Sequence, residues 1–291
     1  MTQLDTIILG IGGVGSAALF HCARRGVRVL GIDRFAPPHD RGSSHGDTRL
    51  IRQTYFEHPD YVPLVQRAFN LWQDLERRSG QTLYHETGLL QIGPAAGEVI
   101  SGVRQSARLH KLGIENLSAR DAAARFPGFR VPEYCEAIFE RRAGYLLVER
   151  CVEVHIEQAV RLGAQVRTDE AVRGWRAEGD GVVVETDHGS YAAARLIICA
   201  GAWSAQLLGS LGIPLEVRRK PLYWWRTRGE TYRADRGSPA FLYDLPDGCF
   251  YGFPQIDPRG VKVAEHTGGD TADPDALDRE LHPADQARIV Q

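Results

Sequence analysis

Two arginines are spaced in a way that could hold an acidic group. Arg49 and Arg52 lie three positions apart in the stretch GDTRLIR, which begins at Gly46. A guanidinium group can hold a carboxylate in a fixed plane through two parallel hydrogen bonds. If the stretch is helical, this spacing places both side chains on one face. Two surface arginines are the ordinary alternative, and the position of the pair after a glycine-rich loop favours a binding role.

Three side chains nearer the other end of the chain could also take part in chemistry. Lys262 lies between two valines in a β-like segment, where its ammonium can point into a pocket or, more commonly, to solvent. His266 follows four residues later, and a single histidine is more often structural than catalytic. Tyr251, in the sequence YGFP, could belong to the core or to a pocket wall. The residues alone therefore leave all three roles open.

The N-terminus carries the pattern of a dinucleotide-binding unit. An apolar run at 6–9 leads directly into the sequence GIGGVG, which spans Gly10 to Gly15. Gly10 permits a tight turn, Gly12 lets the backbone approach a pyrophosphate, and Gly15 lets the next helix pack closely on the strand. The helix expected at 16–25 offers N–H groups and a positive dipole end to phosphates. The pattern does not say which dinucleotide is bound.

Other elements are expected to complete this unit. A second apolar run at 27–32 ends at Asp33, where a carboxylate can accept hydrogen bonds from the adenosine ribose hydroxyls. A hairpin expected over 181–191 leads into a buried strand, which starts at Arg195 and ends in the pair Ala-Gly at 200–201. We expect this strand to bring the backbone to the same cofactor a second time.

The remaining periodicity predicts a mixed chain. Helices are expected at 61–78, 98–112 and 152–162, and strands at 87–93, 137–140 and 144–147. After Pro214, aromatic-rich segments predict antiparallel strands of the kind that wall a small-molecule pocket.

Composition limits the class of protein. A chain of 291 residues predicts about two domains, and 43% hydrophobic with 25% charged residues is an ordinary globular balance. Lys plus Arg (35) nearly cancels Asp plus Glu (37), so we expect no nucleic-acid partner. Five cysteines without a CxxC pair predict free thiols and no metal site. With no membrane-length apolar run and no signal peptide, we expect a cytoplasmic protein.

These residues together resemble the monomeric sarcosine oxidase and N-methyltryptophan oxidase family of FAD-dependent amine oxidases. The resemblance runs through nearly the whole chain. It is sharpest in PPH at 37–39, GSSHGDTRLIR at 42–52, YVPL at 61–64, GAW at 201–203, YGFP at 251–254 and the pair Lys262 and His266. It implies an α/β fold, with a Rossmann-type FAD-binding domain interleaved with an antiparallel-sheet substrate domain. The implied boundaries are 1–84 with 145–215 for the FAD-binding domain, and 85–144 with 216–291 for the substrate domain.

The resemblance also implies an activity. The family oxidises secondary amino acids such as sarcosine and other N-methyl amino acids, transfers a hydride to the flavin, reduces O2 to H2O2 and is monomeric. By resemblance, Arg52 holds the substrate carboxylate and Arg49 lies beside the flavin. Lys262 promotes oxygen reduction, because a cation near the flavin stabilises developing superoxide charge. Tyr251 and His266 match residues of the substrate pocket.

The resemblance implies the following cofactor-binding residues as well: Gly10, Gly12, Gly13, Val14, Gly15, Asp33, Arg34, Ser43, His45, Thr48, Val172 and Gly201.

One departure from the family pattern concerns length. Family members continue beyond the point where this sequence stops, at Gln291, and that part carries a cysteine bonded to the flavin and a glycine-rich segment near its ring. None of the five cysteines here takes that position, so we expect a C-terminally truncated member. Three alternatives stay open: a non-catalytic FAD-binding fragment, an ATP-dependent adenylylating enzyme with a similar glycine loop, and an NAD-dependent dehydrogenase.

Overall fold

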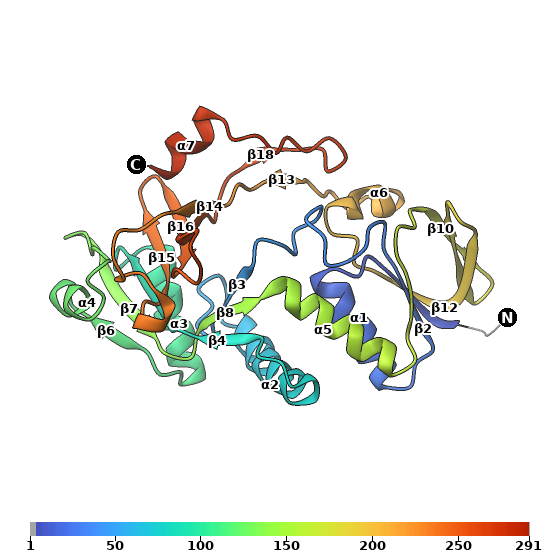
Figure 1. Cartoon of the computed structure of the whole chain (residues 1–291), viewed down its shortest axis with the longest axis horizontal. Coiled ribbons are helices and arrows are strands. Elements are labelled where there is room, and N and C mark those ends of the chain that lie inside the picture. Colours follow the sequence, from blue (N-terminus) through green and yellow to red (C-terminus); the bar gives the residue numbers. More distant parts are fainter. Residues whose placement is uncertain (1–3, 291) are drawn as a thin grey trace.

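The structure, a computed structural model, describes residues 4–290. A six-stranded sheet lies at one end of the molecule and a seven-stranded sheet at the other, with a three-stranded sheet between them (Figure 1). A two-stranded sheet, β13 (Arg218–Arg219) with β18 (Asp270–Thr271), completes the set. This arrangement confirms the predicted mixed α/β class.

The six-stranded sheet is built around the glycine unit. Its order is β10-β11-β12-β1-β2-β9, with β1 parallel to both β12 and β2, and β2 parallel to β9. The strands are β1 (Leu4–Leu9), β2 (Val29–Ile32), β9 (Gln165–Arg167), β10 (Val172–Glu178), β11 (Gly181–Thr186) and β12 (Ser190–Ile198). The predicted hairpin is confirmed, since β10, β11 and β12 form an antiparallel meander.

The second half of β12 differs from its prediction. We expected a buried strand from residue 195, yet Arg195 is exposed and residues 196–198 are half-buried. The pairing of β12 with β11 ends at Ala193, and on that side the later residues pair with no strand within residues 4–290. The prediction of burial was therefore wrong, because one edge of this half-strand is uncovered.

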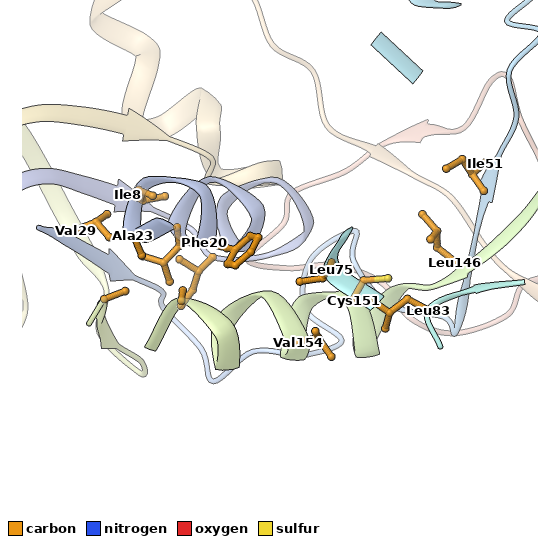
Figure 2. Close-up of a cluster of buried hydrophobic side chains, with 14 of the residues drawn as sticks. Ile8, Phe20, Ala23, Val29, Ile51, Leu75, Leu83, Leu146, Cys151 and Val154 are labelled. Carbon is orange, nitrogen blue, oxygen red and sulfur yellow. The ribbon is translucent and has the colours of Figure 1, made fainter. Parts of the chain in front are cut away.

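Helices α1 (Gly13–Arg24), α2 (Tyr61–Ser79) and α5 (Val148–Arg161) share one hydrophobic core with the sheet. Figure 2 shows this core, in which Phe20 of α1 and Val154 of α5 lie near Leu75 of α2. The same cluster reaches Ile51 and Leu146 of the three-stranded sheet. One continuous core therefore ties the dinucleotide unit to the strand that carries Arg49. Helix α5 begins four residues before its predicted start.

The three-stranded sheet has the order β3-β8-β4, with β3 (Thr48–Ile51), β8 (Gly144–Leu147) and β4 (Tyr84–Glu86). The supposed helix around Arg49 and Arg52 is therefore wrong. Arg49 pairs with Leu146 in an antiparallel ladder, and Arg52 follows directly after the strand. A strand sends successive side chains to opposite faces, so a spacing of three does not place the two guanidinium groups side by side.

The seven-stranded sheet has the order β14-β17-β16-β15-β5-β7-β6 and is antiparallel except for the parallel pair β15–β5. Its strands are β5 (Leu89–Gly93), β6 (Glu115–Leu117), β7 (Glu136–Glu140), β14 (Tyr223–Trp225), β15 (Ala240–Leu245), β16 (Gly248–Phe253) and β17 (Val261–Glu265). The remaining helices are α3 (Glu98–His110), α4 (Ala119–Arg125), α6 (Ser204–Leu208) and α7 (Pro283–Ile289). The aromatic-rich strands expected after Pro214 are thus confirmed.

The domain boundaries stay a prediction. The six-stranded sheet falls within 1–84 and 145–215, and the seven-stranded sheet within 85–144 and 216–291. Strands β4 and β8 cross the predicted boundaries, because the three-stranded sheet is shared between the two ranges. The terminal residues 1–3 and 291 lie outside the described residues.

The closest backbone approach in the glycine unit yields a stability prediction. A Cβ atom at Gly15 would lie 1.8 Å from the carbonyl oxygen of Gly10, so Gly15→Ala must push α1 away from β1. We expect unfolding to become easier by about 1–3 kcal/mol, the usual cost of overpacking. Gly174→Ala is the matched control, since a Cβ there meets nothing within 4 Å. Equal urea midpoints for the two variants would contradict this packing.

Candidate cofactor and substrate site

The turn between β1 and α1 is shaped by close backbone contacts. Gly10 has φ +80°, and a Cβ there would lie 2.5 Å from the carbonyl oxygen of Cys199 at the end of β12. The N–H of Gly13, in the first turn of α1, donates to Ser44 Oγ at 2.9 Å. The N–H groups of Val14 and Gly15, which follow in this turn, have no acceptor inside the helix and are available to bind an anion.

A cavity of about 580 Å³ opens over this turn. It lies where β1, β2 and β12 end, and the start of β10 and the loop at 42–44 also line it. Nine of the predicted cofactor-binding residues line the cavity: Gly10, Gly12, Gly13, Val14, Asp33, Arg34, Ser43, Val172 and Gly201. The volume lies within the range of small-molecule sites. The prediction that the strand ending in Ala-Gly returns to the same place is confirmed.

Three predicted cofactor-binding residues lie elsewhere. Gly15 is buried in α1, where it lets the helix approach Gly10. His45 binds the carbonyl oxygen of Gly42 through Nδ1 at 2.6 Å, inside its own loop. Thr48 is buried at the start of β3, next to Lys262. Their part in cofactor binding remains a proposal.

Asp33 is buried at the edge of the cavity. Its Oδ2 accepts from the N–H of Ile11 at 2.8 Å, and its Oδ1 accepts from the N–H of Phe35 at 3.0 Å. The ring of His39 lies 3.4 Å away through Nε2. A carboxylate offers about four lone-pair sites, so acceptor capacity is left for hydroxyl groups in the cavity.

A cluster around Asp275 closes one side of the same cavity. Asp275 accepts from Trp203 Nε1 at 2.9 Å and from Gln206 Nε2 at 3.1 Å, and it forms an ion pair with Arg34. The hydrogen bonds from Trp203 and Gln206, followed by that from Arg34, lower the pKa of Asp275 to about 2. The segment between β18 and α7 thus reaches across to α6 (Figure 1). Sequence reasoning missed Asp275, which lies 241 positions from Arg34.

Lys262 is buried, with 3% of its surface exposed, so of the two orientations that the sequence left open its side chain takes the one away from solvent. Its Nζ donates to the carbonyl oxygen of Gly46 at 2.5 Å and to both the carbonyl oxygen and Oγ1 of Thr48 at 3.0 Å. The ammonium also lies 4.8 Å from the centre of the Phe253 ring. Burial, reinforced by the nearby charge of Arg49, lowers the pKa of Lys262 to about 7.

The loop that receives Lys262 is fixed by charged groups. Glu149, in the first turn of α5, accepts from the N–H of Gly46 at 2.7 Å and from that of Asp47. Arg49 donates to the carbonyl oxygen of Thr48 at 2.8 Å and to that of Ser43. Burial lowers the pKa of Arg49. The loop that borders the cavity is therefore hydrogen-bonded to two cationic side chains, Arg49 and Lys262.

Arg52 lies in a second group, and 7% of its surface is exposed. Its Nη2 donates to both carboxylate oxygens of Glu57 at 2.6 Å, and its guanidinium lies 4.4 Å from the Tyr55 ring and 4.8 Å from the Phe56 ring. The Nε of Arg52 is buried without a hydrogen-bond partner. A cation held this way presents donors to a carboxylate that could replace Glu57.

His266 and Tyr251 border the same group. The His266 ring lies edge-on to both Phe56 and Tyr251 at 6.1 Å, and its Nε2 is 3.9 Å from Glu57. Burial lowers the pKa of His266, and the charge of Arg52 lowers it further. Burial raises the pKa of Tyr251, against the influence of Arg49. A neutral imidazole and a neutral phenol therefore flank the cations at neutral pH.

Three further features of the described chain bear on function. Among residues 4–290, no three His, Cys, Asp or Glu side chains gather as a metal site. Helices long and apolar enough to cross a membrane are likewise missing from this part of the chain. The five cysteines are free thiols in the structure.

Comparison with known proteins assigns the chain to a protein family. The model of the family described as FAD dependent oxidoreductase matches residues 5–291. The chain belongs to this family. It is 37% identical to the monomeric sarcosine oxidase of Bacillus sp. (strain B-0618), over 99% of this chain and 75% of that protein. It is 39% identical to the N-methyl-L-tryptophan oxidase of Shigella dysenteriae serotype 1 (strain Sd197), over 92% of this chain and 71% of that protein.

A solved structure supports the same relationship. NikD, described as an unusual amino acid oxidase essential for nikkomycin biosynthesis, superimposes with a TM-score of 0.82 and 27% identity, over 99% of this chain and 76% of that one. The chain thus spans about three quarters of the length of these relatives. The resemblance, the fold class, the enzyme class and FAD as the cofactor are confirmed. The adenylylating and NAD-dependent alternatives are not favoured.

The residues present are compatible with FAD. The cavity is large enough for part or all of a dinucleotide, and the first turn of α1 faces it with N–H groups. Asp33 keeps acceptor capacity where a ribose would lie. These chain groups would hold the pyrophosphate and the adenosine half of FAD.

Asp33 gives a direct test of the cofactor site. In Asp33→Asn an amide N–H₂ replaces one acceptor beside the N–H groups of Ile11 and Phe35. We expect the Kd for FAD, measured by quenching of flavin fluorescence, to rise roughly tenfold to hundredfold. Asp180→Asn, at an exposed turn, should leave the Kd unchanged. An unaltered Kd in Asp33→Asn would show that this carboxylate does not contact the cofactor.

Lys262 makes stability depend on pH. Below about pH 7 it is charged in both the folded and the unfolded state. From there to its ordinary pKa of 10.5 only the unfolded state keeps the proton. Stability therefore rises with pH in this window, by at most about 1.4 kcal/mol per pH unit. Lys262→Met removes this pH dependence. The free energy of unfolding of the wild type should therefore increase relative to that of the variant as pH rises.

Urea unfolding at several pH values between about 6 and 10 measures this difference. Lys111→Met is the control, because it removes an exposed ammonium and leaves Lys262 in place. The same pH dependence of the unfolding free energy in the Lys262 and Lys111 variants would contradict a lowered pKa of Lys262.

Proposed function

We propose that the protein is an FAD-dependent oxidase of secondary amino acids, sarcosine or other N-methyl amino acids. In this reaction a hydride leaves the carbon beside the amine nitrogen, the resulting imine is hydrolysed, and O2 is reduced to H2O2. The observation that carries the proposal is the guanidinium of Arg52, which is buried beside two aromatic rings and paired with the carboxylate of Glu57. The names of the relatives, which are oxidases of sarcosine and N-methyl-L-tryptophan, support it.

Arg52 would bind and orient the substrate. A substrate carboxylate can take the place of Glu57, because both groups offer two oxygens to the same planar donors. The buried Nε of Arg52, which has no partner, supplies a further donor. This ion pair would fix the amino acid at one end and leave its amine free to approach the reacting centre.

The neighbours of Arg52 suit a neutral amine. A protonated amine has no lone pair with which to assist hydride loss, so the amine must give up its proton. His266 is kept neutral by burial and by the charge of Arg52, and Tyr251 is kept protonated by burial. Placed at 6.1 Å from each other, the two rings would form one wall of the substrate pocket.

Lys262 and Arg49 would supply positive charge where electrons are transferred. When bound, FAD supplies the hydride acceptor and passes two electrons on to O2. Lys262 is held by the oxygens of Gly46 and Thr48 and has a pKa near neutrality, so it can place a proton and a charge where superoxide develops. We further propose a monomer in the cytoplasm, as predicted from the sequence.

Release of peroxide from the FAD-loaded protein tests the reaction. Sarcosine, N-methyltryptophan and pipecolate cover small, aromatic and cyclic secondary amino acids. Peroxide from at least one of them is expected, and silence with all three would contradict the proposed activity.

Arg52→Ala tests the binding role separately. Loss of a charge-assisted ion pair should raise the apparent KM for the best substrate roughly tenfold to hundredfold, with a smaller change in kcat. Arg77→Ala removes an exposed arginine from α2 and should leave KM unchanged. Normal turnover with an unchanged KM in Arg52→Ala would show that Arg52 does not bind the substrate carboxylate, although the proposed reaction would still stand.

A further inference from the structure

The segment that carries Arg52 encloses its own guanidinium. We call residues 52–57 the clasp. Within it, the rings of Tyr55 and Phe56 lie 4.4 and 4.8 Å from the guanidinium, and Glu57 holds Nη2. These contacts fix the side chain relative to the clasp. They do not fix the clasp relative to the rest of the protein.

Glu140 provides that second anchor. It is the last residue of β7 in the seven-stranded sheet, and 2% of its surface is exposed. Its carboxylate accepts from the N–H of Gln53 at 2.5 Å, from the N–H of Thr54 at 3.2 Å, and from the hydroxyl of Thr54. A buried carboxylate thus binds the two residues that directly follow Arg52.

The surroundings of the clasp strengthen this anchor. Gln91 of β5, fully buried, donates to Thr54 Oγ1 at 3.3 Å. From α3, the Ser106 hydroxyl donates to the carbonyl oxygen of Tyr55. A Cβ on Gly102 of α3 would lie 2.3 Å from the carbonyl oxygen of Phe56, so the helix packs directly on the clasp backbone. The clasp is therefore held between a helix and a sheet.

We propose that Glu140 is a positioning residue, which sets the place of the Arg52 guanidinium for the substrate carboxylate through the backbone of residues 53 and 54. The inference rests on the proposed function. Burying a carboxylate without a hydrogen-bonded cation is costly. The position of Glu140 is explained if its carboxylate serves to fix the backbone next to Arg52. Burial raises the pKa of Glu140, and its hydrogen bonds to residues 53 and 54, followed by the charge of Arg52, oppose that rise.

Glu140→Gln keeps the size of the side chain and replaces one acceptor by a donor that faces the N–H groups of the clasp. With the FAD-loaded protein, we expect the apparent KM for sarcosine and the Kd for acetate each to rise roughly tenfold, while kcat changes less than about twofold. Saturation-transfer NMR on the acetate methyl signal measures the Kd without turnover. Glu136→Gln is the matched control, because Glu136 lies on the same strand and pairs with Arg104, away from the clasp.

Two further variants separate positioning from mere stability. In an Arg52→Ala background, Glu140→Gln should have no additional effect on acetate binding, since its action passes through Arg52. Thr54→Val, which removes one partner of Glu140 at constant shape, should raise the acetate Kd in the same direction if Glu140→Gln fails to fold. An effect of Glu140→Gln that persists without Arg52, or an unchanged acetate Kd in both clasp variants, would overturn the proposal.

The acetate measurement also distinguishes this inference from the proposed reaction. Silence in the peroxide assay together with acetate binding that depends on Glu140 and Arg52 would reject the reaction and keep the positioning role. If the wild-type protein binds no acetate, Arg52 is no carboxylate site, and the inference falls with it.

Discussion

The burial of the Lys262 ammonium among the oxygens of Gly46 and Thr48 is the contact on which the rest of the site depends. Lys262 belongs to β17 in the seven-stranded sheet, whereas its acceptors belong to the loop that leaves the cofactor cavity and enters β3. One side chain thus joins the seven-stranded sheet to the loop that borders the cavity. The same loop carries Arg49, and the chain continues through β3 to Arg52, so the three cations hold fixed places relative to one another.

Burying cations close together is unfavourable, and acidic residues offset part of the cost. Glu149 accepts from the amides of the loop that receives Lys262, Glu57 pairs with Arg52, and Glu140 anchors the clasp. The three carboxylates come from different parts of the chain: Glu149 from α5, Glu57 from the segment after β3, and Glu140 from the end of β7. Burial lowers the pKa of Lys262 to about 7, so this group can exchange a proton near neutral pH, and it lowers the pKa of His266, which keeps that imidazole neutral.

The parts that the sequence predicted well are local. The glycine turn, the helix after it and Asp33 follow one another within thirty or so residues, and the positive φ of Gly10 and the close approach at Gly15 are requirements that glycine alone meets. Other features depend on partners far along the chain. The strand around Arg49 exists because β8 pairs with it, and local spacing had suggested a helix instead. The burial of Lys262, the contact of Asp275 with Arg34 and the anchor made by Glu140 join positions 87 to 241 residues apart, so periodicity could not reveal them.

The visible absorption of bound flavin tests most directly whether this arrangement oxidises a secondary amino acid through FAD. The protein is loaded with FAD, freed of excess cofactor by gel filtration, and mixed with sarcosine, N-methyltryptophan or pipecolate in the absence of oxygen. We expect the absorption to be lost with at least one of these substrates and to return when oxygen is admitted. Retained flavin whose absorption is unchanged by all three would contradict the proposed function.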